Sequence, residues 1–301
     1  MAPSFDEITA RVEAGDALSD RDIVELGASR DIIMLGMLAT IVRRRLHGTE
    51  VTYVRVADLK VGAGGTLEGP AHPRESQRDS AGEVRIFDTP KTLEAAEDVV
   101  ARARETAGGT PVSAFCLYEL SKLPEGLPVT LAALKKAGLE IITQAPIDRL
   151  SDPERALETL TDAGLQLSRL TVNETPAREW TSVCRDVAAL QTKLGSIRTF
   201  APLAREIDTT HPTTGYEDVK RIAISRLLME NVPTIQVDWA LYGPKLAQVA
   251  LTFGADDLDS VSAEDDDAHG RRRAPIEEIR RSIRAAGFEP VERDARFQRR
   301  D

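Results

Sequence analysis

From residue 51 onward, short apolar runs alternate with longer segments that carry the apolar spacing of helices. Seven runs contain β-branched and aromatic residues, as strands do: 51–56, 83–88, 111–116, 139–144, 165–172, 196–204 and 232–239. An eighth candidate strand, 255–260, follows the next helical segment in the same order. Glycine residues close several of the helical segments before the next run begins, at Gly138, Gly164, Gly195 and Gly254. This order predicts parallel strands joined by helices, and eight of them predict an α/β fold of the (β/α)8 TIM-barrel type.

The first fifty residues precede this alternation and indicate helices. Ser19 is a typical N-cap, and a later apolar segment ends on basic residues and Gly48. We therefore predict an N-terminal helical segment over 1–50 packed on a barrel over 51–260, followed over 261–301 by a linker and a C-terminal helix or closing segment. Residues 57–82 are rich in Gly, Pro and charge, so we expect an irregular loop there and an incomplete first crossover.

Charge and composition exclude two classes of partner. Lys and Arg number 39 against 49 Asp and Glu, which gives a net charge of -10, and aromatic residues make up only 4%. A chain this acidic is repelled by phosphate backbones and anionic membranes, so we expect neither nucleic acid nor membrane as a partner. Because no apolar run reaches about 18 residues and the N-terminus lacks the pattern of a signal peptide, we expect a cytoplasmic protein.

Thiols and imidazoles are few. Cys116 and Cys184 are the only cysteines, which argues against a disulfide framework or a cysteine-rich metal site, and we expect both to be ordinary semi-buried thiols. The histidines have no partner at metal-ligand spacing, and they are His47, His72, His211 and His269. The glycines at 61–65 lack the third spaced glycine of a dinucleotide-binding loop.

The carboxyl ends of barrel strands face one shared mouth, where barrel proteins bind substrates. The residues at these ends are Arg55, Asp88, Glu119, Gln144, Glu174, Arg205, Asp238 and either Asp256 or Asp257. Such a mouth either binds a polar metabolite or holds salt bridges that only maintain the structure, and the sequence leaves both readings open. We expect no dedicated metal site from the carboxylates around residue 257 alone, since a hard cation takes ligands from several elements.

The segment from 232 to 260, VPTIQVDWALYGPKLAQVALTFGADDLDS, closely resembles the last barrel strands of a known family. The family is that of the radical S-adenosylmethionine enzymes of the futalosine pathway to menaquinone, closest to aminofutalosine synthase and dehypoxanthine futalosine cyclase. Three further segments resemble it: AFCLYEL, LQTKLGSIRTFAPLA and the closing IRAAGFEPVERDARF. The resemblance covers most of the chain and implies the same barrel.

The chain departs from this family where the cofactor chemistry belongs. The family carries C-x3-C-x2-C after its first strand, three thiolates that hold a 4Fe–4S cluster, and the corresponding stretch here, VRVADLKVGAGGTLEGP, contains no cysteine. The glycines that pack against S-adenosylmethionine are replaced by TQAPIDRL, and the family's G-H-x-E strand end is reduced to VNET, which keeps only Glu174. We therefore expect no cofactor, neither the cluster nor S-adenosylmethionine.

Two functions are compatible with this combination. In the first, the chain is a cluster-less paralogue that works as a non-catalytic accessory or regulatory subunit linked to menaquinone synthesis, bound to a metabolite or to an intact radical enzyme homologue. In the second, it is a cluster-independent enzyme for a related small metabolite, with acid and base groups drawn from Glu119, Glu174, Asp238 and Asp257. Whether the chain is an enzyme stays open.

Individual mouth residues have alternative roles. The resemblance implies that Asp257 faces the mouth, since it matches the family's aspartate, and we expect Asp256 to cap a helix or to meet solvent. Trp239 either lines a ligand pocket or belongs to the core. Arg205 either pairs with a substrate carboxylate or forms an internal ion pair.

Overall fold

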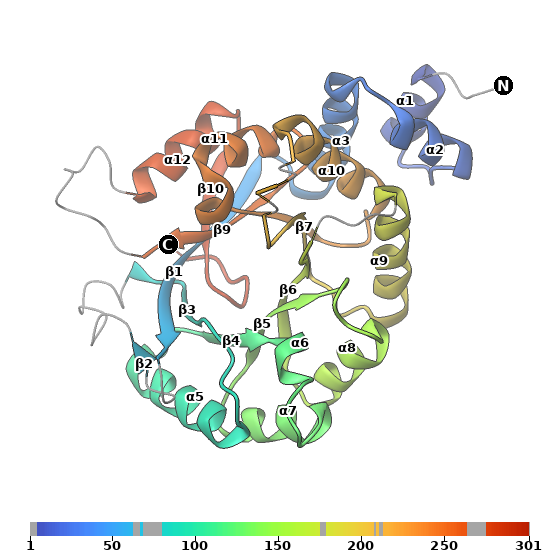
Figure 1. Cartoon of the computed structure of the whole chain (residues 1–301). Coiled ribbons are helices and arrows are strands. Elements are labelled where there is room, and N and C mark those ends of the chain that lie inside the picture. Colours follow the sequence, from blue (N-terminus) through green and yellow to red (C-terminus); the bar gives the residue numbers. More distant parts are fainter. Residues whose placement is uncertain are drawn as a thin grey trace.

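A closed barrel of eight parallel strands forms the centre of the molecule (Figure 1). The computed structural model describes residues 5–62, 67–68, 80–174, 179–207, 209–210, 213–263 and 275–300. The barrel strands are β1 (Glu50–Val61), β3 (Glu83–Ile86), β4 (Val112–Cys116), β5 (Ile141–Pro146), β6 (Gln166–Val172), β7 (Thr199–Ala204), β8 (Thr234–Asp238) and β9 (Asp257–Ser262). Each strand pairs in parallel with the next, and β9 pairs with β1 to close the ring. The predicted TIM-type barrel is therefore confirmed.

Helices follow the strands and form the outer ring of the barrel (Figure 1). They are α5 (Leu93–Ala107), α6 (Leu117–Leu120), α7 (Leu127–Lys136), α8 (Pro153–Asp162), α9 (Trp180–Leu194), α10 (Gly215–Leu228), α11 (Trp239–Leu251) and α12 (Pro275–Ala285). The sequence encodes their ends locally. Thr214 begins α10 with a capping box to Glu217, and Gly195 ends α9 in the left-handed conformation, at φ 66°. No helix in the described parts of the chain is long and apolar enough to cross a membrane.

Three further helices precede the barrel: α1 (Phe5–Ala14), α2 (Asp20–Ala28) and α3 (Ile32–His47). Ser19 caps α2 through a capping box with Asp22, and Gly48 follows the last residue of α3, so both predicted helix ends are confirmed. α3 packs along α10, while α2 contacts α9 and α10. The N-terminal segment thus covers one side of the barrel.

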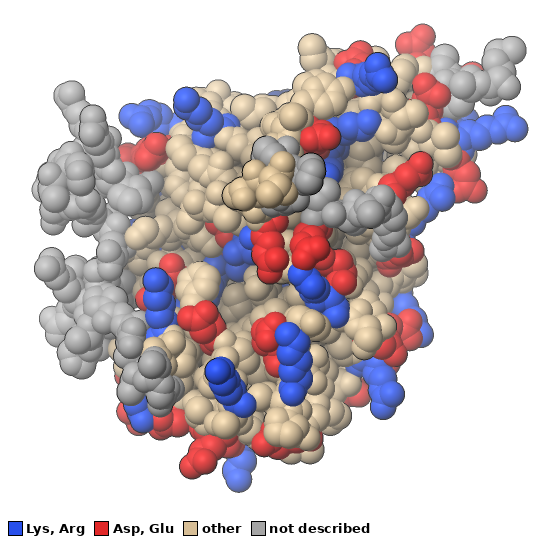
Figure 2. All heavy atoms as spheres, viewed as in Figure 1, with Lys and Arg blue, Asp and Glu red and all other residues tan. Residues whose placement is uncertain are grey.

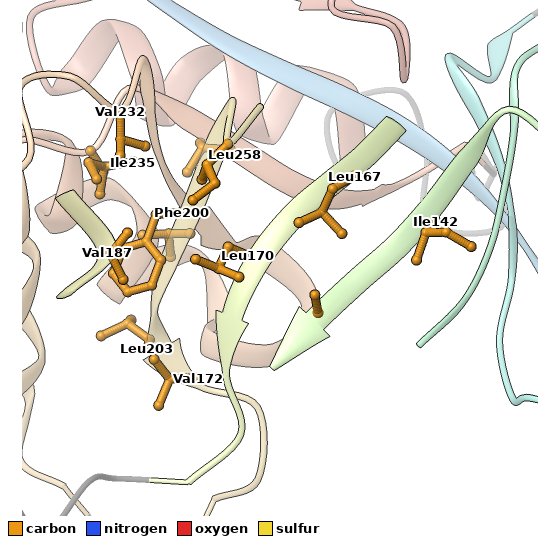
Figure 3. Close-up of a cluster of buried hydrophobic side chains, with 14 of the residues drawn as sticks. Ile142, Leu167, Leu170, Val172, Val187, Phe200, Leu203, Val232, Ile235 and Leu258 are labelled. Carbon is orange, nitrogen blue, oxygen red and sulfur yellow. The ribbon is translucent and has the colours of Figure 1, made fainter. Parts of the chain in front are cut away.

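The hydrophobic core is the layer between the outer face of the strands and the surrounding helices. Figure 3 shows part of it, where Phe200 and Leu203 of β7 lie near Val187 of α9 and beside Leu170 of β6. Trp180 of α9 stacks on Phe200, with ring centroids 6.2 Å apart. Because this layer takes the apolar side chains, every second strand residue points to the other face, into the lumen.

Two strand segments differ from the prediction. Residues 57–61, expected to begin the irregular loop, extend β1 and pair with β3 and with the short β2 (Leu67–Glu68), because VADLKV alternates apolar and polar residues as strands do. The loop's remaining stretches 63–66 and 69–79 lie outside the described residues. In addition, β10 (Glu289–Arg293) pairs in parallel with β1, so the expected closing segment includes a strand that the sequence did not predict.

Gly82 lies where two strands share one edge of β1. β10 pairs with residues 50–54 and β3 with residues 56–59, while β9 occupies the opposite edge. Gly82 donates its backbone N–H to Arg55 O at 2.9 Å and accepts one from Ala295 N at 3.1 Å. A Cβ at this position would lie 2.5 Å from the carbonyl oxygen of Arg293, so a larger residue does not fit.

We predict that Gly82→Ala lowers the free energy of unfolding by about 1–3 kcal/mol, because the added methyl group forces two backbone segments apart. Gly215→Ala is the matched control, since its Cβ would meet no atom within 4 Å and its φ is ordinary. This control should keep or slightly raise the stability. Urea unfolding followed by circular dichroism measures both variants, and equal stabilities would contradict the close approach at Gly82.

Candidate functional site

Four charged side chains meet inside the barrel: Glu83 and Arg85 from β3, Arg169 from β6 and Asp259 from β9. Each exposes only 1% of its surface. Because β3, β6 and β9 are not paired with one another in the sheet, their side chains can meet only across the lumen. The barrel interior thus holds a charged cluster instead of the branched apolar layers that usually fill such barrels.

Arg85 is the best-satisfied member of this cluster. Its Nε and Nη2 donate to the two carboxylate oxygens of Glu83, at 2.8 Å each. Its Nη2 and Nη1 also donate to the two oxygens of Asp259, at 2.7 and 3.1 Å. Ser113 of β4 donates to Glu83 and is within 3.2 Å of the Thr143 hydroxyl on β5. Every atom of the Arg85 guanidinium that bears hydrogen therefore has a partner.

Arg169 is bound less completely. Its Nη1 forms an ion pair with Asp259, whose carboxylate already accepts hydrogen bonds from Arg85. The Nε atom of Arg169 is buried and has no hydrogen-bond partner. The Asp259 carboxylate is therefore shared by two guanidinium groups, and it accepts two hydrogen bonds from Arg85 but forms one contact with Arg169.

A second ion pair lies next to this cluster at the carboxyl end of the strands. Arg205 Nη1 donates to Asp238 Oδ2 at 2.6 Å, and Asp238 Oδ1 accepts the backbone N–H of Leu241 at 2.9 Å, which caps α11. Ser260 connects the two groups: its hydroxyl lies 3.0 Å from Asp238 Oδ2 and 3.3 Å from Asp259 Oδ2. Ser260 has φ 57°, a conformation that is uncommon outside glycine and marks a locally constrained backbone.

The ionisation of these groups follows from their partners. Burial disfavours the charged form of Glu83, but Arg85 and the hydrogen bonds to Glu83 outweigh it and lower the pKa to about 2. Asp238 is buried as well, and Arg205 and Arg169 lower its pKa to about 2. Burial, with repulsion from Arg85 and Arg205, lowers the pKa of Arg169 well below its ordinary value. The carboxylates are held charged, whereas Arg169 is a cation with too little compensation.

A cavity of about 400 Å³ opens above this cluster at the mouth of the barrel. Figure 2 shows the same end of the molecule, with acidic and basic side chains gathered around a central hollow. The residues that line the cavity come from the ends of β3 to β7 and the segments that follow: Ile86, Phe87, Asp88, Thr89, Phe115, Cys116, Glu119, Thr143, Gln144, Arg169 and Arg205. Its volume lies in the range of small-molecule sites.

The structure brings several of the predicted mouth residues together. Arg205 and Asp238 form the ion pair described above, which is one of the two roles considered for Arg205. Glu119 lines the cavity from α6, where it pairs with Lys122 at 2.9 Å, and Asp88 and Gln144 line it too. Glu174 follows β6 but is exposed and pairs with Arg149. Trp239 is half-buried against the core and does not line this cavity, which agrees with the second of the two positions considered for it, in the core.

The expected mouth position of Asp257 is wrong. Asp257 begins β9, at the opposite end of the strand from the mouth, and is fully buried. Arg293 of β10 donates to both of its oxygens, at 2.6 and 2.7 Å, and Gln236 donates at 2.7 Å. The alternation of a strand gives the face of a side chain but not its level along the barrel, and the resemblance alone did not supply that level.

The expectation for Asp256 is also wrong. This carboxylate is 4% exposed and forms an ion pair with Arg226 of α10, although burial raises its pKa. It therefore neither caps a helix nor meets solvent.

The residues that sequence reasoning missed are the lumen charges Glu83, Arg85, Arg169 and Asp259. The sequence pattern that could have identified Glu83 and Arg85 is a charged pair two residues apart within an otherwise apolar strand, since two such residues face the same side of the strand.

We predict that this cluster makes the protein sensitive to acid. Because folding lowers the pKa of Glu83 from 4.5 to about 2 and that of Asp238 from 3.8 to about 2, their stabilising contribution is complete above about pH 4.5. It is lost as the pH falls from there toward about 2. Urea unfolding at a series of pH values should show this decline. Glu83→Gln should flatten it, whereas Glu119→Gln, on an exposed carboxyl, should leave it unchanged; identical slopes in all three proteins would contradict this assignment.

The residues present do not fit a 4Fe–4S cluster. Such a cluster needs thiolates that converge on one point. Cys116 ends β4, whereas Cys184 is buried on α9 with its Sγ 3.7 Å from Ser225 Oγ of α10, outside the barrel. Burial raises the pKa of both thiols, that of Cys184 to about 12, so neither favours the thiolate. Across the described ranges, no three His, Cys, Asp or Glu side chains are grouped to hold a metal ion.

Comparison with known proteins shows which proteins this chain resembles. A family model described as the CofH/MqnC C-terminal region matches residues 199–301. Aminodeoxyfutalosine synthase of Streptomyces coelicolor is 25% identical, and the alignment covers 97% of this chain and 93% of that protein. The enzyme of the same name from Thermus thermophilus is 27% identical, over 98% of this chain and 96% of that protein.

Both alignments span more positions, 365 and 357, than the 301 residues of this chain, so the relatives carry internal segments that it lacks. Among solved structures, methylornithine synthase shares the fold with a TM-score of 0.66 at 14% identity, over 94% of this chain and 97% of that one. The chain is therefore similar over nearly its whole length to aminodeoxyfutalosine synthases and at its C-terminal region to the CofH/MqnC model, in agreement with the resemblance of its motifs, and it shares the barrel fold of methylornithine synthase.

Proposed function

We propose that the chain is a cluster-less paralogue of aminodeoxyfutalosine synthase-like enzymes. It works in the cytoplasm as a non-catalytic accessory or regulatory subunit of menaquinone synthesis by the futalosine pathway, and its partner is a homologue that keeps the three-cysteine motif. The observation that carries the proposal is the position of the two thiols. Cys116 and Cys184 lie on different elements and both favour the protonated form, so the barrel offers no ligands for a radical-generating cluster.

The state of the acidic residues supports a non-catalytic role. A general base must be free to take a proton from a substrate. Asp238 is held ionised by Arg205, Glu119 is paired with Lys122, and Glu174 is paired with Arg149. Asp257 lies at the far end of the barrel. The four carboxylates considered for acid and base chemistry are thus either bound to cations or away from the mouth.

One carboxyl favours the alternative, a cluster-independent enzyme. Asp58 of β1 lies next to Arg85 in the register of the sheet and keeps an exposed side chain. Reduced hydration inside the barrel, together with nearby Glu83 and Asp238, raises its pKa to about 6, although Arg85 opposes the shift. A carboxyl with a pKa near neutrality suits proton transfer, so this alternative would use Asp58 as its base.

We predict that affinity-tagged chain, purified from its native cytoplasm, recovers a homologue with C-x3-C-x2-C, identified by mass spectrometry. The same chain, reconstituted anaerobically with iron and sulfide, should hold no stoichiometric iron and show no absorbance near about 400 nm, where 4Fe–4S clusters absorb. Tagged homologue should recover the chain in the reciprocal experiment, and the tag alone should recover neither protein.

Three outcomes would contradict this proposal in different ways. Stoichiometric iron after reconstitution would mean that the chain builds a cluster. Recovery of the tagged chain without the homologue, and of the tagged homologue without the chain, would remove the accessory role. Turnover of a metabolite by the purified chain, abolished by Asp58→Asn but not by Glu174→Gln, would establish the alternative enzyme.

A further inference from the structure

The floor of the mouth cavity carries a buried cation without a complete set of partners. Arg169 lines the cavity and is 1% exposed. Its Nε donates no hydrogen bond, although buried guanidinium groups normally use their donors. Among the described residues Arg169 forms one ion pair, with Asp259, while Asp238 and Glu83 act on it through longer-range attraction. Arg169 is therefore the point in the lumen where an additional acceptor would be stabilised most.

The neighbouring arginines do not have this deficit. Arg85 donates to both oxygens of Glu83 and of Asp259, and Arg205 donates to Asp238. Burial and these two cations together lower the pKa of Arg169 well below its ordinary value. The protein thus holds a third guanidinium beside two satisfied ones, which is unfavourable unless another anion approaches it.

The mouth cavity gives an anion access to Arg169, which is one of its lining residues. Arg205 lines the same cavity and is 17% exposed at its side chain, and the polar side chains of Thr143 and Gln144 also line it. The carboxylates of Asp88 and Glu119 lie at the exposed rim, where Glu119 is already paired with Lys122. The cavity is therefore cationic at its floor and acidic at its rim.

We propose that the floor of this cavity binds a small oxyanion, the carboxylate or phosphate group of a metabolite, with Arg169 as the buried anchor and Arg205 beside it. Two oxygens of such a group match the planar donors of a guanidinium. The acidic rim selects against ligands with further negative charge outside the floor. This site goes beyond the accessory role and does not depend on it, because it concerns only what occupies the mouth.

Isothermal titration calorimetry of the full chain with inorganic phosphate and, separately, with acetate tests the site, at constant ionic strength set with sodium chloride. We expect one equivalent of at least one anion to bind, and Arg169→Met to weaken that binding by at least about tenfold, as loss of a charge-assisted hydrogen bond does. Binding of phosphate alone would indicate a phosphorylated ligand, and binding of acetate alone a carboxylate.

Thermal unfolding separates this role from a structural one. Arg169→Met removes an under-compensated charge and leaves the Arg85 contacts of Asp259 in place, so the melting temperature should stay the same or rise. The bound anion should raise the melting temperature of the wild type but not of this variant. If Arg169 were only structural, the variant would be less stable and would bind as before.

Arg198→Met is the matched control. Arg198 lies over the ring of Phe297, at 4.2 Å, and with it lines a separate pocket that shares no residue with the mouth. The control removes the same charge but should keep anion binding. Arg169→Gln provides a second variant should Arg169→Met not fold. The site is refuted if neither anion binds the wild type, or if the folded Arg169 variants bind as tightly as Arg198→Met, whatever the pull-down recovers.

Discussion

The carboxylate of Asp259, shared by Arg85 and Arg169, is the contact on which the barrel interior depends. An eight-stranded barrel leaves a lumen just wide enough for side chains to fill it. Here that space holds ions, and each buried ion costs several kcal/mol unless it is paired. The pairing therefore fixes β3, β6 and β9 relative to one another across the lumen, in addition to the hydrogen bonds of the sheet. Because Asp259 is shared, Arg169 keeps an unused hydrogen-bond donor, and Arg169 also lines the mouth cavity. The ions inside the barrel therefore determine the chemistry at the floor of the mouth.

The acidic segment at the end of the barrel distributes its charges to three different places. Asp256 binds Arg226 of α10, on the outer side of the barrel. Asp257 binds Arg293 of β10, and so ties the C-terminal strand to the base of the barrel. Asp259 reaches the lumen cluster. Three carboxylates within four positions therefore form no common site. Each carboxylate forms a separate ion pair. Neighbouring residues of a strand face opposite sides of the sheet, and residues two apart face the same side at different levels along the barrel.

Local patterns in the sequence were sufficient for the barrel but not for its charged interior. The strands and helices follow from alternation, N-caps such as Ser19 and glycine ends such as Gly195, all of which depend on neighbouring residues. β10 was missed because EPVER has a proline and three charges, and its place depends on pairing with β1, more than two hundred residues away. The partners in the lumen are as distant: Arg85 and Asp259 lie 174 residues apart. Sequence showed which residues are charged but could not show which charges meet.

The similarity to the futalosine-pathway enzymes and the departure from their cysteine motif lie in different parts of the chain. The family model matches residues 199–301, and this region holds Arg226, Asp256, Asp257 and Arg293, whose two ion pairs close the barrel. These contacts belong to the fold and do not depend on what the barrel binds. The cluster would instead belong after β1, where the sequence has no cysteine. A chain that keeps its closing contacts can lose the thiolates, retain the fold and still present a mouth. The Arg169 guanidinium then decides which ligands that mouth accepts, since an oxyanion supplies the partner that the fold does not.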